Sequence, residues 1–123
     1  MTQGFTFSGR LRSIRLAGRG IALMLRTQHN AWVHALATIA VIAAGLLWRV
    51  SAAEWCWLVL AIVAVWTAEA LNTALELLAD VASPGFHPLV EKAKDVAAGA
   101  VLISALGAVA IGILVLGPHL MRE

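Results

Sequence analysis

The sequence predicts an all-α integral membrane protein with one N-terminal amphipathic surface helix and three transmembrane helices. Hydrophobic residues make up 61% of the 123 residues and charged residues 13%, whereas soluble domains average about 45–50% and 25%. The apolar residues form continuous runs, which favour membrane-spanning helices over the strands of a barrel. A chain of this length is expected to form one domain.

The N-terminal region has the pattern of a helix that lies on a membrane. Residues 1–6 are expected to be a flexible tail and residues 7–28 an amphipathic surface helix. Apolar residues recur in this segment at spacings of three and four, and so do Arg12, Arg15 and Arg19. A basic amphipathic helix lies in the interface plane of an anionic leaflet. Two interpretations stay open, a plain anchor or an anchor that also forms a wall of a functional site.

Three later segments are long and apolar enough to cross a bilayer. They are residues 31–48, 55–79 and 94–117, near the length of about 17–25 residues that spanning requires. His34 is close to the start of the first span, so we expect it at the interface.

The connections between the spans are short. Before the second span, Ser51 and Glu54 have the spacing of a helix capping box. Residues 80–91 are expected to form a cytoplasmic loop that contains two prolines. Pro118 is expected to end the third span, with residues 118–123 as a tail.

The basic residues predict the orientation in the membrane. The net charge is +2, and seven Lys and Arg residues fall on the side that holds the N-terminus and the loop 80–91. The positive-inside rule therefore places that side in the cytoplasm. No basic patch is interleaved with aromatic residues, so nucleic-acid binding is not indicated. The single cysteine, Cys56, excludes an internal disulfide.

One face of the second span carries an unusual set of polar residues. Glu69, Asn72, Glu76 and Asp80 lie within an arc of about 80° at 100° per residue, and Lys94 and Asp95 follow across the loop. Acidic residues in a membrane helix usually mark a functional site. Carboxylates suit Mg²⁺ that bridges phosphate oxygens, and a lysine adds a positive charge for phosphate. Glu69 is placed deepest, where it can take a proton from a lipid hydroxyl.

From the residues alone, other interpretations stay open. The same acidic face fits an ion or proton pathway through a small helix bundle. The polar residues also fit a structural role in which they pair with Lys92 and Lys94 at the membrane surface. A non-enzymatic assembly subunit is a third alternative. His87 is expected to be a loop residue rather than a ligand.

The cluster resembles the prokaryotic diacylglycerol kinase family, which includes the undecaprenol kinases. The resemblance rests on Glu69-Ala70-Leu71-Asn72-Thr73-Ala74-Leu75-Glu76, on Asp80, and on Lys94-Asp95 followed by Ala97-Ala98-Gly99-Ala100-Val101. It covers about residues 8–117. It implies a homotrimer in the bacterial inner membrane, with active sites between subunits on the cytoplasmic side. It also implies transfer of the γ-phosphoryl group of ATP, with Mg²⁺, to the hydroxyl of diacylglycerol or undecaprenol.

The resemblance also implies roles for individual residues. Glu69 is similar to the family's catalytic base and Glu76 to its metal-binding carboxylate. The implied nucleotide and phosphate contacts are Asn72, Lys94, Asp95, Gly20, Asp80 and His87. Gln28 stands where the family commonly has a second metal-binding glutamate. An amide offers Mg²⁺ an oxygen without a charge, so a weaker second metal site is expected.

Overall fold

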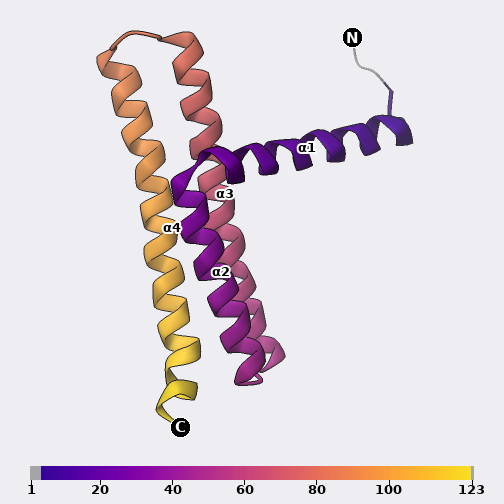
Figure 1. The fold of residues 1–123 in the computed structure, drawn as a ribbon, viewed down its shortest axis with the longest axis vertical. Coiled ribbons are helices and arrows are strands. Elements are labelled where there is room, and N and C mark those ends of the chain that lie inside the picture. The colour runs from indigo at the N-terminus through magenta and orange to yellow at the C-terminus, as the bar shows by residue number, and fades with distance from the viewer. Residues whose placement is uncertain (1–3, 123) are drawn as a thin grey trace.

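Four helices joined by short connections make up residues 4–122 in the computed structural model (Figure 1). They are α1 (Phe7–Thr27), α2 (His29–Leu47), α3 (Ala52–Ala82) and α4 (Pro88–Met121). Residues 1–3 of the expected N-terminal tail and residue 123 of the C-terminal tail lie outside the part that the structure describes. Within residues 4–122 there is no strand, and α2, α3 and α4 are each long and apolar enough to span a membrane. The predicted fold class is therefore confirmed.

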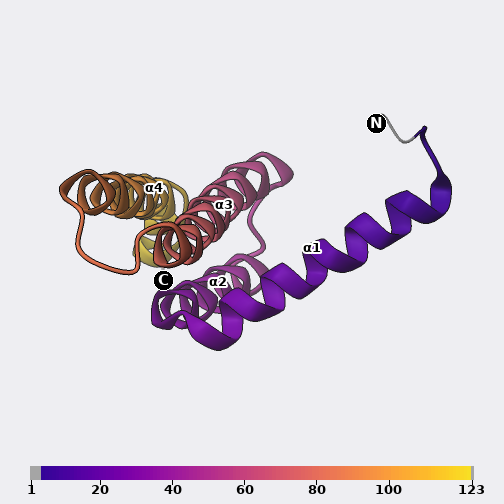
Figure 2. The same cartoon turned by 90° about the horizontal axis from the view of Figure 1, so that it is seen from above.

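The helix α1 leaves the bundle at a steep angle. It runs outward from the start of α2, while α2, α3 and α4 lie alongside one another (Figures 1 and 2). Its arginines are exposed, and Met24 near its end is buried against the bundle. Such a projecting helix with a basic face suits a position along the membrane surface.

A hydrogen bond across the corner between α1 and α2 fixes this angle. The indole Nε1–H of Trp32 donates to the backbone carbonyl of Leu25 at 2.6 Å. The last carbonyls of a helix have no partner within it, so Trp32 satisfies one of them from the next helix. Ala31 has no exposed surface, which lets the start of α2 pack closely at the corner.

A tight turn connects α2 to α3. Arg49 has a positive φ of 51°, and the N–H of Val50 donates to the carbonyl of Gly45 at 3.1 Å. This is the bonding of a Schellman motif, which ends a helix with one residue in the left-handed region. Ser51 and Glu54 form the predicted capping box. Both devices define where α3 begins.

The helices α3 and α4 form a long antiparallel hairpin that extends beyond α2. They have 31 and 34 residues, against 19 in α2. The connection between them is shorter than the expected loop 80–91. Asp80 lies in α3, and Glu91 lies in α4, which starts at Pro88. The reason is local, because His87 caps α4 through its ring and proline is favoured at the first helical position.

Pro118 lies inside α4 rather than at its end. Proline removes one backbone hydrogen bond, here in the last turn, where the remaining chain is short. Three residues later α4 ends at Met121. His119, in this last turn, contacts Glu54 of α3 with Nε2–Oε2 and Nε2–Oε1 distances of 3.1 and 3.2 Å, which gives the turn a tertiary anchor.

Close packing between α2 and α3 depends on Gly45. A Cβ at this position would lie 2.5 Å from Cη2 of the Trp55 ring. We expect Gly45→Ala to lower the midpoint of thermal unfolding in detergent, because displacing a packed ring costs about 1–3 kcal/mol. Gly107→Ala is the matched control, since a Cβ there meets nothing within 4 Å. Equal midpoints for both variants would contradict the packing described.

Candidate functional site

Glu69 is the most deeply buried charged residue of α3 among residues 4–122. It has 0% exposed surface, although a carboxylate is costly to remove from water without a partner. Its Oε2 lies 3.3 Å from Nε2 of His34 on α2. Its Oε1 is buried and has no hydrogen-bond partner within the described chain. One oxygen therefore has a partner, and the other is buried without one among the described residues.

The height of Glu69 in the membrane follows from its contact with His34. His34 is five residues beyond the start of α2, which is about 7–8 Å along the axis at 1.5 Å per residue. Because α1 and α2 meet at that start, Glu69 lies just below the level of the surface helix. A spanning helix thus carries its buried carboxylate close to one membrane surface.

Asn72 and Glu76 continue the site along α3. Asn72 is 6% exposed, and its Nδ2 donates to Oε1 of Glu76 at 3.4 Å. The Oδ1 of Asn72 is buried and lacks a partner within residues 4–122. Glu76 is half-buried and Asp80 is exposed. Burial of these polar side chains therefore decreases steadily from Glu69 toward the end of α3.

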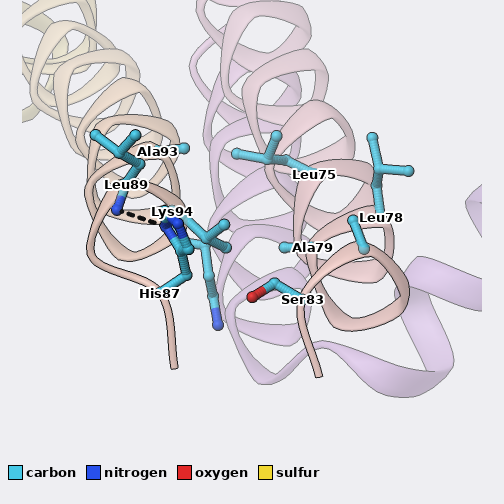
Figure 3. Close-up of a pocket in the computed structure, with 10 residues that line it drawn as sticks. Leu75, Leu78, Ala79, Ser83, His87, Leu89, Ala93 and Lys94 are labelled. Atoms are coloured by element: carbon cyan, nitrogen blue, oxygen red, sulfur yellow. Dashed lines mark hydrogen bonds between the residues drawn. The ribbon is translucent and has the colours of Figure 1, made fainter. Parts of the chain in front are cut away.

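His87 and Lys94 line a small cleft between the ends of α3 and α4. The cleft has a volume of about 370 Å³ and is otherwise lined by mostly apolar residues such as Leu75 and Val90. Figure 3 shows Lys94 on α4 and His87 just before it, across the gap from Ala79 on α3 and from Ser83 just after that helix. The ring Nδ1 of His87 accepts a hydrogen bond from the N–H of Leu89 at 3.2 Å. The cleft therefore has a half-buried lysine and an ordered histidine in its lining.

The remaining sequence-predicted residues are not joined to this core within the described single chain. Gln28 lies between α1 and α2, where its Nε2 donates to Thr27. Gly20 is exposed on α1, and Asp95 is exposed on α4. No group of three acidic, His or Cys side chains is close enough to hold a metal ion within residues 4–122.

The two lysines in the first turns of α4, Lys92 and Lys94, form no ion pair with the acidic face of α3 in the described part of the chain. Between residues 4 and 122, ion pairs within 4.0 Å join His34 to Glu69 and His119 to Glu54. The alternative in which Lys92 and Lys94 pair with the carboxylates of α3 therefore finds no support. Lys94 has no ion-pair partner among residues 4–122.

Sequence reasoning missed His34 and Thr73 as parts of the site. Thr73 is 4% exposed, and its Oγ1 donates to the backbone carbonyl of Glu69 at 2.9 Å. The signal for His34 was its polarity inside an apolar run, which generally marks function in a membrane helix. Its position near the start of the span instead suggested a residue at the interface.

An apolar groove leads along the bundle toward this site. It has a volume of about 860 Å³ and is lined by α2, α3 and α4, from Val33 on α2 to Trp48 just after that helix, and from Ala105 to Met121 on α4. Its lining includes His34 and Thr38 at the end near Glu69. Small residues such as Ala37 and Ala108 keep the groove open.

Comparison with known proteins places the chain in a family. Residues 15–116 match the prokaryotic diacylglycerol kinase family. The chain is 42% identical over 104 residues to a protein of Bacillus subtilis (strain 168) named undecaprenol kinase, with 85% of each chain covered. It is 39% identical over 112 residues to a Synechocystis protein named diacylglycerol kinase, covering 90% of this chain and 64% of the relative. The predicted resemblance is confirmed, and the chain belongs to the prokaryotic diacylglycerol kinase family.

Proposed function

We propose that this membrane lipid kinase transfers the γ-phosphoryl group of ATP to the hydroxyl of diacylglycerol or undecaprenol, with Glu69 as the general base. Family membership supports the kinase activity. The observation that carries the role of Glu69 is its full burial with Oε2 held by His34 and Oε1 without a partner in the described chain. A free, desolvated carboxylate oxygen is suited to accept a proton.

The proposed reaction moves one proton and one phosphoryl group. Glu69 takes the proton of the acceptor hydroxyl on Oε1 as the hydroxyl oxygen bonds to the γ-phosphorus. The bond between the γ-phosphorus and the bridging oxygen breaks, and ADP leaves. Phosphoryl transfer depends mainly on positioning and on neutralising charge, so the residues around Glu69 have to hold two substrates in line.

We assign the divalent cation, Mg²⁺, to Glu76, with Gln28 as a second ligand. The chemistry of these donors fits, because carboxylate and amide oxygens are the ligands that Mg²⁺ prefers. The buried, unpartnered Oδ1 of Asn72 beside Glu76 offers a further polar atom on the same side. When bound, the cation would neutralise the phosphate oxygens of ATP.

The nucleotide phosphates are assigned to the end of the α3–α4 hairpin at which residues 83–87 connect the two helices. Lys94 and His87 line the cleft there, and a lysine supplies a positive charge for phosphate. Asp95, Asp80 and Gly20 are assigned to the nucleotide as well, and all three are exposed. Their exposure suits contact with a water-soluble substrate.

We assign the hydrocarbon chain of the acceptor to the apolar groove. The groove is open along the bundle and reaches His34, which contacts Glu69. A lipid whose chain lies in this groove would have its hydroxyl near the free oxygen of Glu69. Diacylglycerol carries its free hydroxyl on a glycerol esterified with two acyl chains, and undecaprenol carries its hydroxyl at the end of an isoprenoid chain. Both therefore join apolar chains to a hydroxyl, and the groove suits this shared chemistry.

We also propose a homotrimer with active sites between subunits, in the inner membrane and facing the cytoplasm. The scattered placement of Gln28, Asp95 and Gly20 in one chain supports a site completed by a neighbour. The arginine-rich α1 and the lysines of α4 lie on the same side as the site, which supports the cytoplasmic orientation.

The direct test offers diacylglycerol and undecaprenol side by side to purified protein in mixed micelles with MgATP labelled in the γ-phosphoryl group. Label in the extracted lipid is the expected result. An ion- or proton-conducting bundle, or an assembly subunit, would leave both lipids unlabelled.

We expect Glu69→Gln to lower the rate of phosphoryl transfer by about 10²–10⁴-fold, the usual contribution of a general base. Binding of MgATP should persist, because the nucleotide residues are untouched. Glu91→Gln is the control, since Glu91 is an exposed carboxylate in the first turn of α4. The measurements are the steady-state rate of phosphoryl transfer and the binding of MgATP. An unchanged transfer rate in Glu69→Gln would contradict the assignment of Glu69 as the general base.

We expect Gln28→Glu to keep activity and to lower the Mg²⁺ concentration for half-maximal rate, because a carboxylate adds charge to an oxygen ligand. Asn30→Asp adds the same charge two residues away and serves as the control. Titration of the initial rate against Mg²⁺ measures the effect. Complete inactivation of folded Gln28→Glu protein would argue against the placement of Gln28 near the metal.

We expect Ala108→Phe to raise the KM for the lipid acceptor by roughly 10-fold, because inserting a larger side chain into a packed apolar site costs about 1–3 kcal/mol. The KM for MgATP should not change. Ala110→Phe is the control on the same helix, because Ala110 is exposed and outside the groove lining. If both variants change the lipid KM equally, the chain does not occupy this groove.

A further inference from the structure

His34 lies on α2 and contacts two side chains of α3, and none of the roles proposed above includes it. Its side chain is 14% exposed, although it lies in an apolar helix and faces the apolar groove. Its ring packs edge-on against Trp66 of α3, with centroids 6.1 Å apart and planes at 71°. A polar ring enclosed in this way needs a partner for its N–H, and Glu69 is that partner.

A second set of hydrogen bonds fixes the wall on which the ring rests. The indole Nε1–H of Trp66 donates to Oγ1 of Thr38 at 3.0 Å. The hydroxyl of Thr38 in turn donates to the backbone carbonyl of His34 at 2.7 Å. Trp66 is thereby tied to the same turn of α2 that carries His34. The position of the imidazole relative to α3 is set by side chains from both helices.

The two oxygens of Glu69 have different surroundings as a consequence. Oε2 lies 3.3 Å from Nε2 of His34, whereas Oε1 is buried without a partner among residues 4–122. With its proton on Nε2, a neutral imidazole donates to the carboxylate and fixes its rotation. An N–H donor also offsets part of the cost of burying an ionised carboxylate.

We propose that His34 is a positioning residue for Glu69, which holds Oε2 so that Oε1 is presented to the acceptor hydroxyl. This inference rests on the proposed function, since it concerns the residue assigned as the base. His34 touches neither phosphate nor metal in this arrangement and acts through Glu69. Its loss should therefore affect the chemical step more than the binding of nucleotide.

The test compares four variants of the full-length protein in mixed micelles with MgATP and lipid acceptor. His34→Leu removes the donor and is expected to lower kcat by about 10–100-fold, the usual effect of losing an orienting partner. The KM for MgATP should stay within about 2-fold. His34→Gln places an amide N–H near the position of Nε2 and should recover most of kcat. His34→Asn has a shorter amide and should recover less.

The fourth variant, His29→Leu, is the matched control. His29 is an exposed histidine at the first position of the same helix, and its replacement should leave kcat unchanged. Should His34→Leu fail to fold, the order of His34→Gln above His34→Asn decides the question. Equal kcat for these two amides, or wild-type kcat in folded His34→Leu, would overturn the inference.

Combining changes at His34 and Glu69 in one protein tests the positioning role separately from the proposed function. Glu69→Asp shortens the side chain and moves the carboxylate away from His34. Adding His34→Leu to Glu69→Asp should therefore lower kcat much less than adding it to the wild-type protein. Full and independent effects of the two changes would overturn the role of His34. If Glu69→Gln retains full transfer, the proposed function fails instead. If Glu69→Gln is inactive while His34→Leu keeps its kcat, the base stands and only the positioning role fails.

Discussion

The burial of the Glu69 carboxylate is the constraint on which the arrangement of the helices depends. A charged group with no exposed surface is tolerated in an apolar bundle only where polar partners are fixed in place. The partner comes from α2, so α2 and α3 must keep one register and one separation. Gly45 and the tight turn at Arg49 set that separation at the other end of α2.

The same constraint explains the unequal lengths of the helices. Because His34 sits near the start of α2, Glu69 has to lie near the level at which α1 turns along the membrane. The rest of α3 then extends past α1, together with the first turns of α4 (Figure 1). Residues that suit water-soluble ligands, such as Asp80, His87 and Asp95, are found on this extension, where they are exposed. In the other direction from Glu69, the groove between α2, α3 and α4 is lined mainly by apolar residues.

Local patterns in the sequence were enough to predict the helices and to group several polar residues on one face of the second span. Continuous apolar runs identified the spans, and helical periodicity grouped Glu69, Asn72 and Glu76 on one face. The capping box at Ser51 was also visible, because it depends on residues three apart. The prediction that the third span ends at Pro118 was wrong, since α4 continues to Met121. A proline in the last turn of a helix disrupts few backbone hydrogen bonds.

Local patterns could not predict contacts between residues that are far apart in the sequence. His34 and Glu69 are 35 residues apart, and their meeting depends on how α2 rotates about its own axis against α3. That rotation depends on packing at Gly45, Trp55 and Trp66. Such packing cannot be deduced from composition or periodicity.

The uninterrupted course of α3 has a consequence for how the protein tolerates different membranes. Glu69 and Glu76 are seven residues apart on one helix, which is nearly two full turns and about 10 Å along the axis. Tilting of the helix, the usual response to a thicker or thinner bilayer, changes neither this spacing nor the shared direction of the two side chains. The relative placement of the two carboxylates is therefore independent of the thickness of the surrounding lipid.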